Sequence, residues 1–291
     1  MVLAAGTAAY GRELEGVMPL DAVGGLVTKA VSPKPRAGAP APRVAEFPGG
    51  MINAVGLANP GLEAVRSQDL PWLAQHAGGT RVIVNVVGDI AEDYAEVVAG
   101  LDGERGIDAF ELNVSCPNVK AGGLEFGSDP RSLAAVVAGA RAATRRPLFV
   151  KLSPTVRDLE AAARGAVDAG ADGITLVNTI PGLVIDIEHR RPALGFGTGG
   201  VSGAGLLPVG VLATWKVSRA VSVPLIGVGG VARGEDVVQY LMAGASLVGV
   251  GTAALRDPRA PARIVLELEK WCRAHGVAEL ASLIGSVRWP A

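Results

Sequence analysis

The chain has 291 residues, of which 49% are hydrophobic and 19% are charged, so it is too apolar to stay disordered and long enough to bury a large core. Its 27 basic and 28 acidic residues give a formal net charge of −1 and form no basic block, which argues against nucleic-acid binding. The apolar runs are too short and glycine-rich to span a bilayer, and the first residues lack the features of a signal peptide, so we expect a cytoplasmic protein.

Short β-branched or apolar runs alternate with longer alanine-rich stretches of helical periodicity. The runs predict eight strands, at residues 2–4, 26–28, 82–85, 109–113, 148–151, 173–178, 225–228 and 247–250. The amphipathic stretches predict helices at residues 94–99, 130–144, 159–169, 209–220 and 235–243. This rhythm favours a parallel sheet, and eight strands close a (β/α)8 barrel, here one domain over residues 1–291. A doubly wound open sheet is the alternative.

Two longer segments interrupt the alternation. Residues 30–61 are rich in proline and glycine and contain no convincing helix, and residues 179–205 are similar. Loops of this length in a compact domain are usually binding loops or lids, with a plain insertion as the alternative. We therefore expect both segments to lie over the mouth of the barrel.

Polar side chains stand where several predicted strands end. These positions are Lys29, Asn85, Asn113, Lys151 and Asn178. In a barrel the carboxyl ends of all strands meet at one mouth, which is where active sites form. A lysine is costly there unless it meets an anion, an acid or a reduced cofactor. The pattern therefore predicts a site for a polar or anionic ligand.

Glycine-rich turns follow the last two predicted strands, at residues 227–230 and 249–252. Loops in these positions of a barrel commonly bind phosphate, because glycine lets backbone N–H groups approach an oxyanion and a following helix adds a favourable dipole. One such turn is an ordinary strand-to-helix connection, but two in succession predict a ligand that carries phosphate.

Two further motifs carry candidate chemistry. Residues 113–118 read Asn-Val-Ser-Cys-Pro-Asn at a strand end, where Cys116 as the thiolate can act as a base or nucleophile. The second cysteine, Cys272, lies on a helical stretch and is interpreted as packing; two cysteines also make no disulfide framework or metal cluster. Residues 53–61 are glycine-rich and offer N–H groups for a carboxylate, although in isolation they read as turn chemistry.

Together these segments resemble the signatures of the dihydroorotate dehydrogenases. They occur in unbroken order over nearly the whole chain, at residues 53–61, 113–118, 150–154, 178–179, 199–203 and both late glycine turns. A cysteine at position 116 resembles class 1 rather than the membrane-linked class 2, and the detailed pattern resembles the class 1B catalytic subunit. The resemblance implies an FMN-binding TIM barrel that oxidises (S)-dihydroorotate to orotate in pyrimidine (UMP) biosynthesis.

The resemblance implies one FMN in this chain. Its phosphate is expected on the glycine turns, and its ring beside Lys151, where a cation stabilises reduced flavin. The residues implied to contact FMN are Ala5, Lys29, Asn85, Asn113, Lys151, Val177, Gly203, Gly229, Gly230, Gly251 and Thr252.

For the substrate, the resemblance implies that Lys29 and the backbone of residues 53–57 hold the carboxylate, while amide side chains read the pyrimidine edge. The implied substrate contacts are Lys29, Asn53, Ala54, Val55, Gly56, Leu57, Asn113, Asn118, Asn178 and Thr179. Cys116 is implied to take the proton from C5 while hydride passes from C6 to flavin N5, beneath a lid of residues 117–127.

The sequence departs from the family pattern at two places. Ala5 stands where the family has a serine that contacts FMN, which removes one hydrogen bond worth roughly 1 kcal/mol. The sequence also begins almost at its first strand, where family members carry an N-terminal hairpin over the barrel floor. We expect either an open floor or a start codon internal to the gene.

The class 1B resemblance implies a homodimer of barrels, each with a partner subunit that carries FAD and a 2Fe-2S cluster and passes electrons to NAD. This sequence has no cluster-binding cysteine set of its own. Three other interpretations stay open: a fumarate-linked class 1A enzyme, a dihydropyrimidine dehydrogenase-like subunit for uncharged pyrimidines, and a non-catalytic barrel that binds a phosphorylated ligand.

Overall fold

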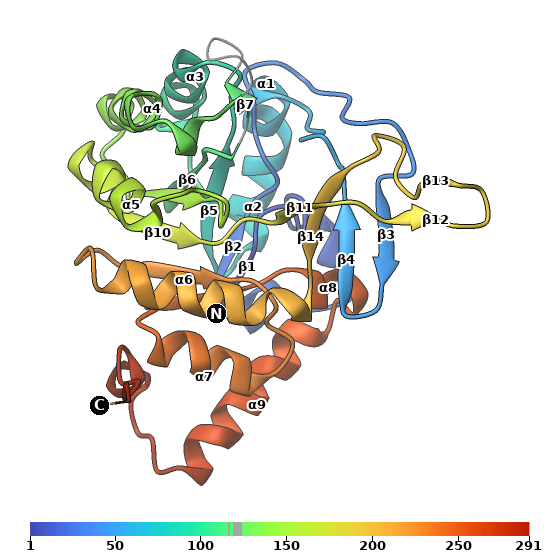
Figure 1. Ribbon diagram of the computed structural model, residues 1–291. Helices are drawn as coiled ribbons and strands as arrows, with labels where there is room; N and C mark the ends of the chain where they lie inside the picture. Colours follow the sequence, from blue (N-terminus) through green and yellow to red (C-terminus); the bar gives the residue numbers. More distant parts are fainter. Residues whose placement is uncertain (116, 119–123, 291) are drawn as a thin grey trace.

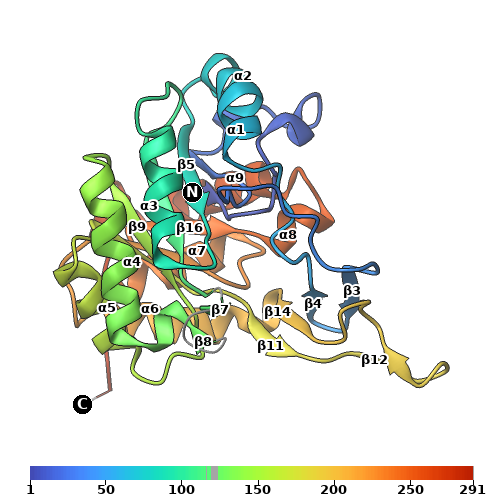
Figure 2. The ribbon, with the colours of Figure 1, turned by 90° about the horizontal axis from the view of Figure 1, so that it is seen from above.

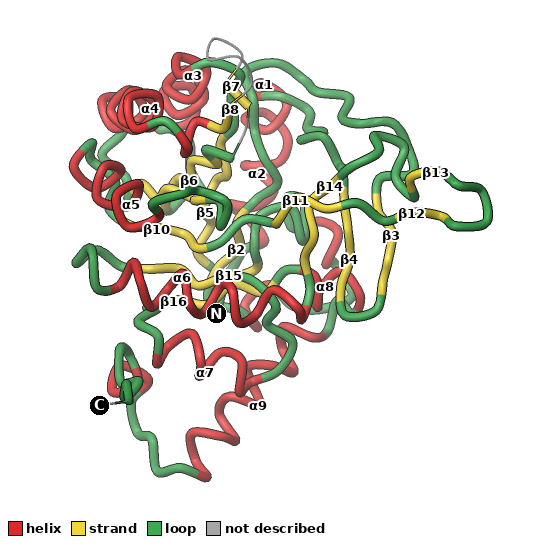
Figure 3. The backbone as a smooth tube through the Cα atoms, in the orientation of Figure 1, coloured by secondary structure: helices red, strands yellow, loops and turns green. Residues whose placement is uncertain are grey.

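The structure is a computed structural model that describes residues 1–115, 117–118 and 124–290, and its centre is a closed barrel of eight parallel strands (Figures 1 and 3). Around the barrel the strands follow the order β1, β16, β15, β10, β9, β6, β5, β2, and every neighbouring pair is parallel. Their bounds are β1 Val2–Leu3, β2 Gly25–Val27, β5 Arg81–Val86, β6 Ala109–Asn113, β9 Leu148–Leu152, β10 Gly173–Leu176, β15 Leu225–Val228 and β16 Leu247–Val250. The predicted (β/α)8 barrel is confirmed, and the open sheet is excluded.

Helices surround the barrel, as Figure 2 shows from above. They are α1 Leu62–Ala64, α2 Leu70–His76, α3 Ala91–Leu101, α4 Pro130–Ala143, α5 Leu159–Asp168, α6 Leu207–Ser218, α7 Gly234–Met242, α8 Thr252–Arg256 and α9 Ala260–Ala274. A π-helical turn, Val65–Asp69, joins α1 to α2. Between β1 and β2 the chain forms two short 3-10 turns, Arg12–Leu14 and Leu20–Ala22, instead of an α-helix. Among the described residues, no helix is long and apolar enough to cross a membrane.

Helix α4 illustrates how local sequence sets these elements. Asp129 caps its N-terminus by accepting a hydrogen bond of 2.8 Å from the backbone N–H of Ser132, and Pro130 occupies the first helical position. Its buried side chains recur at helical spacing and are Leu133, Val136, Val137 and Ala140. This apolar face packs inward because burial of such side chains is the main favourable term in folding.

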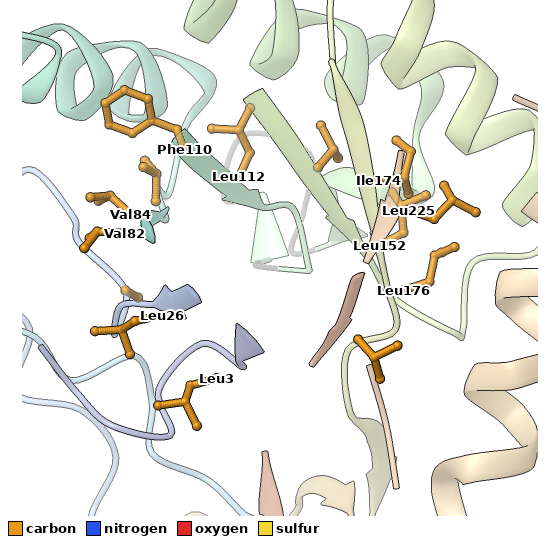
Figure 4. Close-up of a cluster of buried hydrophobic side chains, with 14 of the residues drawn as sticks. Leu3, Leu26, Val82, Val84, Phe110, Leu112, Leu152, Ile174, Leu176 and Leu225 are labelled. Atoms are coloured by element: carbon orange, nitrogen blue, oxygen red, sulfur yellow. The ribbon is translucent and has the colours of Figure 1, made fainter. Parts of the chain in front are cut away.

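Alternation along the strands separates two buried layers. One set of side chains points outward into the layer between strands and helices, including Leu3, Val82, Val84, Phe110, Leu112 and Leu152 (Figure 4). The other set fills the barrel and includes Val27, Ile83, Ala109, Phe149 and Ile226. Since alternate residues of a strand share a face, the residues two positions after Ile83, Ala109 and Phe149 also point into the barrel. Those residues are Asn85, Glu111 and Lys151.

The two long segments predicted as loops pair with each other. They supply β3 (Val44–Phe47), β4 (Gly50–Asn53), β11 (Ile180–Gly182) and β14 (Gly199–Ser202), which form one antiparallel sheet in the order β11, β14, β4, β3. A hairpin of β12 (Ile185–Asp186) and β13 (Arg191–Pro192) projects beyond it (Figure 2). A further pair, β7 (Pro117–Asn118) and β8 (Leu124–Glu125), follows β6. The prediction of loops alone was therefore incomplete, because pairing between distant segments leaves no local periodicity.

Candidate active site

A cavity of about 940 Å³ lies between the carboxyl ends of the barrel strands and the four-stranded sheet. Its volume is that of a small-molecule or cofactor site. The predicted site residues that line it are Ala5, Lys29, Asn53, Ala54, Val55, Gly56, Leu57, Asn85, Asn113, Lys151, Val177, Asn178, Thr179, Gly203, Gly229, Gly230, Gly251 and Thr252. Two predicted site residues cannot be placed beside it: Cys116 lies outside the described residues, and so does the side chain of Asn118, whose backbone belongs to β7.

One end of the cavity is a cradle of glycine backbone. Gly203, Gly229 and Gly230 all have positive φ, at 106°, 129° and 76°. A Cβ on Gly203 would lie 2.6 Å from the Cα of Gly50, and one on Gly230 would overlap the backbone of Leu207. Only glycine therefore fits these positions, and the bare backbone leaves N–H groups for an oxyanion. The cradle has the shape and the donors that a phosphate group requires, and binding of phosphate here stays a prediction.

A hydroxyl pair adds to this end of the cavity. The side chain of Thr252 donates a hydrogen bond of 2.8 Å to the hydroxyl of Ser202, and both residues line the cavity. Ser202 lies within the glycine-rich stretch that the sequence singled out, but it was not predicted as a contact. Two hydroxyls beside the glycine cradle supply further donors for phosphate oxygens.

The bottom of the cavity is a polar layer inside the barrel. Asn85 donates from Nδ2 to Glu111 Oε1 at 2.7 Å, and Thr175 donates from Oγ1 to Glu111 Oε2 at 2.8 Å. Lys151 lies on β9 with its side chain buried, and it lines the cavity together with Asn85. Sequence analysis missed Glu111 and Thr175. The signal for Glu111 was a charged residue inside an otherwise apolar strand, two positions before Asn113.

Amide side chains organise the rim above this layer. Asn178 donates from Nδ2 to Asn113 Oδ1 at 3.1 Å, and the backbone N–H of Thr179 donates to Asn178 Oδ1 at 2.8 Å. Asn53 donates from Nδ2 to the carbonyl of Gly200 at 3.3 Å, which joins the first long segment to the second. These bonds fix the amide groups in one arrangement, as recognition of a planar polar ligand requires.

The predicted carboxylate loop is a tight turn. Gly56 and Leu57 both have positive φ, at 68° and 55°. Asn59, at the base of the turn, donates from Nδ2 to the carbonyl of Leu57 and accepts at Oδ1 from the N–H of Gly61. The motif therefore serves two purposes: Asn59 holds the turn, and residues 53–57 line the cavity beside Lys29.

Glu125 is a second acidic residue that sequence analysis missed. It lines the cavity, and burial raises the pKa of its carboxyl group, partly offset by a hydrogen bond with Ser153. Among the described residues, its Oε2 and the hydroxyl of Ser115 are buried without a hydrogen-bond partner. Within residues 1–115, 117–118 and 124–290, no group of His, Cys, Asp and Glu side chains is arranged to hold a metal ion.

The fold and the cavity define a (β/α)8 barrel with a deep cavity at the carboxyl ends of its strands, lined by glycine backbone, hydroxyl groups, amide groups and two lysines. The dihydroorotate dehydrogenase family model matches residues 1–271, so the chain belongs to the dihydroorotate dehydrogenase family, a family of oxidoreductases. This agrees with the resemblance drawn from the sequence motifs.

Relatives match along nearly the full length. The catalytic subunit of dihydroorotate dehydrogenase B (NAD(+)) from Geobacter sp. strain M21 is 45% identical over 99% of this chain and 93% of its own length. The protein of the same name from Pelobacter propionicus is 46% identical over 99% of this chain and 94% of its own. A Solibacter usitatus protein, provisionally named dihydroorotate dehydrogenase A (fumarate), is 47% identical with the same coverage as the Pelobacter protein.

Proposed function

We propose that the chain oxidises dihydroorotate to orotate on FMN, as the NAD-linked catalytic subunit of pyrimidine biosynthesis. The observation that carries the proposal is that one continuous cavity brings the candidate groups together. It joins a glycine cradle for phosphate, a buried lysine at its bottom and a second lysine beside the turn of residues 53–57. A phosphate-bearing flavin and a small carboxylated ring can share such a space. Membership of the family supports the same reaction.

The residues of the chain have distinct parts in this proposal. Gly203, Gly229, Gly230, Gly251 and Thr252 bind the phosphate of FMN through their backbone N–H groups and the threonine hydroxyl. When bound, FMN supplies the hydride acceptor of the reaction. Ala5, Asn85, Asn113 and Val177 would contact the flavin ring. Lys151 would stabilise the negative charge of the reduced ring, because a buried cation acts strongly at short range.

The substrate part of the cavity follows from charge and shape. Lys29 and the N–H groups of residues 53–57 would hold the carboxylate, and Asn53, Asn113, Asn118, Asn178 and Thr179 would read the edge of the ring. Cys116, as the thiolate, would remove the proton from C5 of dihydroorotate. The carboxylate contacts favour dihydroorotate over uncharged pyrimidines, since Lys29 without an anionic partner would be costly at this rim.

The same proposal includes the route of the electrons. The names of the Geobacter and Pelobacter relatives, catalytic subunits of an NAD(+) enzyme, favour NAD as the acceptor and a partner subunit as the route to it. That the partner carries FAD and a 2Fe-2S cluster, and that two such pairs form a dimer in the cytoplasm, is part of the proposal and rests on the resemblance of the sequence motifs to class 1B. The name of the Solibacter relative keeps direct oxidation by fumarate as the second candidate.

The test is anaerobic mixing of the purified, FMN-loaded chain with dihydroorotate while the flavin absorbance is recorded. We expect rapid bleaching, slowed by about 10²- to 10⁴-fold in Cys116→Ala, because a general base contributes that much. Cys272→Ala is the matched control: Cys272 lies on α9, does not line the cavity, and its loss should leave the rate unchanged. Flavin that is bleached by dihydrouracil but not by dihydroorotate would move the assignment to the uncharged pyrimidines, and flavin bleached by neither would favour a non-catalytic barrel.

The acceptor is tested on the reduced protein. Addition of fumarate should leave the flavin reduced, whereas addition of the partner subunit with NAD should reoxidise it. Rapid reoxidation by fumarate alone would favour the class 1A reaction instead.

A further inference from the structure

We propose that Glu111 is a positioning residue for the flavin: its carboxylate turns the amide oxygen of Asn85 toward the cavity and offsets the charge of Lys151. The inference rests on the proposed function for the identity of the ligand. It concerns a side chain that does not line the cavity itself, and it assigns that side chain an effect on the bound cofactor.

Glu111 is among the most buried charged side chains of the protein. It is 1% exposed, whereas acidic residues are almost never fully buried unless they are paired. Its two described partners are neutral, Asn85 Nδ2 at 2.7 Å and Thr175 Oγ1 at 2.8 Å, one on each carboxylate oxygen. Such a costly arrangement in the middle of a barrel strand calls for a role beyond packing.

The strand register connects this carboxylate to the buried lysine through Thr175. Glu111 is paired with Asn85 on one neighbouring strand and with Phe149 on the other. Lys151, two residues after Phe149, shares its inward face and is paired with Thr175. Lys151 is 7% exposed, so a buried cation and a buried anion both point into the barrel interior, from neighbouring strands and one inward-facing position apart. Because charges in the interior are poorly screened, the carboxylate lowers the free energy needed to bury the lysine, and the lysine does the same for the carboxylate.

The hydrogen bond to Asn85 has a directional consequence. A carboxylate can only accept hydrogen bonds, so the amide group of Asn85 must present its nitrogen to Glu111. The amide oxygen of Asn85 is then directed away from Glu111. Since Asn85 lines the cavity, it offers an acceptor there, suited to an N–H group of the isoalloxazine ring. Glutamine at position 111 has both a donor and an acceptor and would no longer enforce this orientation.

The charge has a separate consequence. In Glu111→Gln one negative charge is lost from the barrel interior, so Lys151 would act on the bound flavin without compensation. Reduction adds negative charge to the ring, and an uncompensated cation favours that charge. The flavin of this variant should therefore be easier to reduce. Glu111→Asp keeps the charge, but its shorter side chain should no longer reach Asn85.

The two variants separate charge from orientation in the FMN-loaded protein. The measurements are the flavin midpoint potential from an anaerobic dye titration and the FMN dissociation constant from flavin fluorescence. Glu111→Gln should shift the potential to more positive values and weaken FMN binding severalfold. Glu111→Asp should keep the wild-type potential and weaken FMN binding to a similar extent. Thr175→Ser, which keeps the hydroxyl donor to Glu111 and changes no charge, is the control for disturbance of the barrel and should leave the potential unchanged.

A wild-type potential in folded, FMN-loaded Glu111→Gln would overturn the charge role, and unchanged FMN affinity in both variants would overturn the orientation role. If Glu111→Gln does not fold, Glu111→Asp still decides the orientation role, and its potential must match the wild type for the charge role to stand. The proposed function fails separately, since a wild-type protein that binds FMN but is not bleached by dihydroorotate leaves these potentials measurable.

Discussion

The phenolic hydroxyl of Tyr240, on α7, donates a hydrogen bond of 2.8 Å to the carbonyl oxygen of Gly229 in the glycine cradle. Tyr240 is fully buried, and the absent side chains of Gly210 and Gly227 leave the space that its ring occupies. Burial, together with the charge of Asp236, raises the pKa of Tyr240, so the hydroxyl remains a donor at every ordinary pH. The turn expected to bind phosphate is thus held from behind by a helix that does not itself line the cavity.

Tyr240→Phe should therefore weaken FMN binding while the ring keeps its packing. Loss of the hydrogen bond leaves the Gly229 carbonyl unsatisfied, which costs about 1 kcal/mol, or roughly a fivefold rise in the FMN dissociation constant. Titration of the FMN-free protein with FMN, followed by flavin fluorescence, measures this dissociation constant. Tyr10→Phe is the control, because it removes a similar hydrogen bond, to the carbonyl of Ala30, away from the cradle. Equal loss of FMN affinity in both variants would contradict a local effect at Gly229.

Gly200 gives a prediction for the substrate side of the cavity. It is paired with Asn53 across β14 and β4, and a Cβ at this position would overlap the hydroxyl of Thr179. Gly200→Ala should displace Thr179 and raise the KM for dihydroorotate about tenfold, equivalent to ~1.4 kcal/mol, with the FMN content unchanged. Steady-state kinetics and flavin absorbance check both points. Gly165→Ala, on α5 with open space around it, is the control, and a lowered FMN content in Gly200→Ala would show that the effect is not confined to the substrate.

The barrel was predictable from the sequence because its strands are short apolar runs that end in polar residues. Lys29, Asn85 and Lys151 could be assigned to one mouth from their strand-end positions alone, since parallel strands end on the same side. Glu111 was not found, although it is a charged residue inside a strand, because its position before the strand end does not show which side chains it meets. Its role appears only when the register places Asn85 and Thr175 against it.

The four-stranded sheet was beyond local prediction for a different reason. Ile52 on β4 is paired with Val201 on β14, and these residues are separated by about half of the chain. A pattern within one segment cannot specify a partner at that distance, so both segments resembled loops. The role of Cys116 stays a prediction, because that residue lies outside the part of the chain that the structure describes.

Arg146 gives a prediction for stability. Its guanidinium donates to the carbonyl oxygens of Asp102, Glu104 and Ile107, which fixes the connection between α3 and β6. Lysine has no planar fork to reach three carbonyls at once. Arg146→Lys should lower the free energy of unfolding by about 2 kcal/mol, or roughly 5 °C in Tm for a chain of this size. Arg145→Lys, at the exposed neighbouring position, is the control in thermal unfolding followed by circular dichroism, and an equal loss there would contradict the assignment.

The N-terminus of α4 gives a prediction for pH. Hydrogen bonds from the side chain and backbone of Ser132 lower the pKa of Asp129 below its ordinary value of 3.8. A carboxyl group with a lowered pKa in the folded state stabilises the fold above its unfolded pKa, and this contribution is lost as the pH falls through the folded value. Asp129→Ala should therefore lower the free energy of unfolding by about 1 kcal/mol at pH 7, and its difference from the wild type should shrink as the pH approaches 3.

Asp129→Asn is the control, because asparagine keeps a capping oxygen but does not titrate. The free energy by which Asp129→Asn is more stable than Asp129→Ala should be the same at each pH. Urea unfolding of the three proteins between pH 7 and pH 3 measures both differences. If the difference in free energy of unfolding between the wild type and Asp129→Ala stays constant over this range, the cap acts through its hydrogen bond alone and not through its charge.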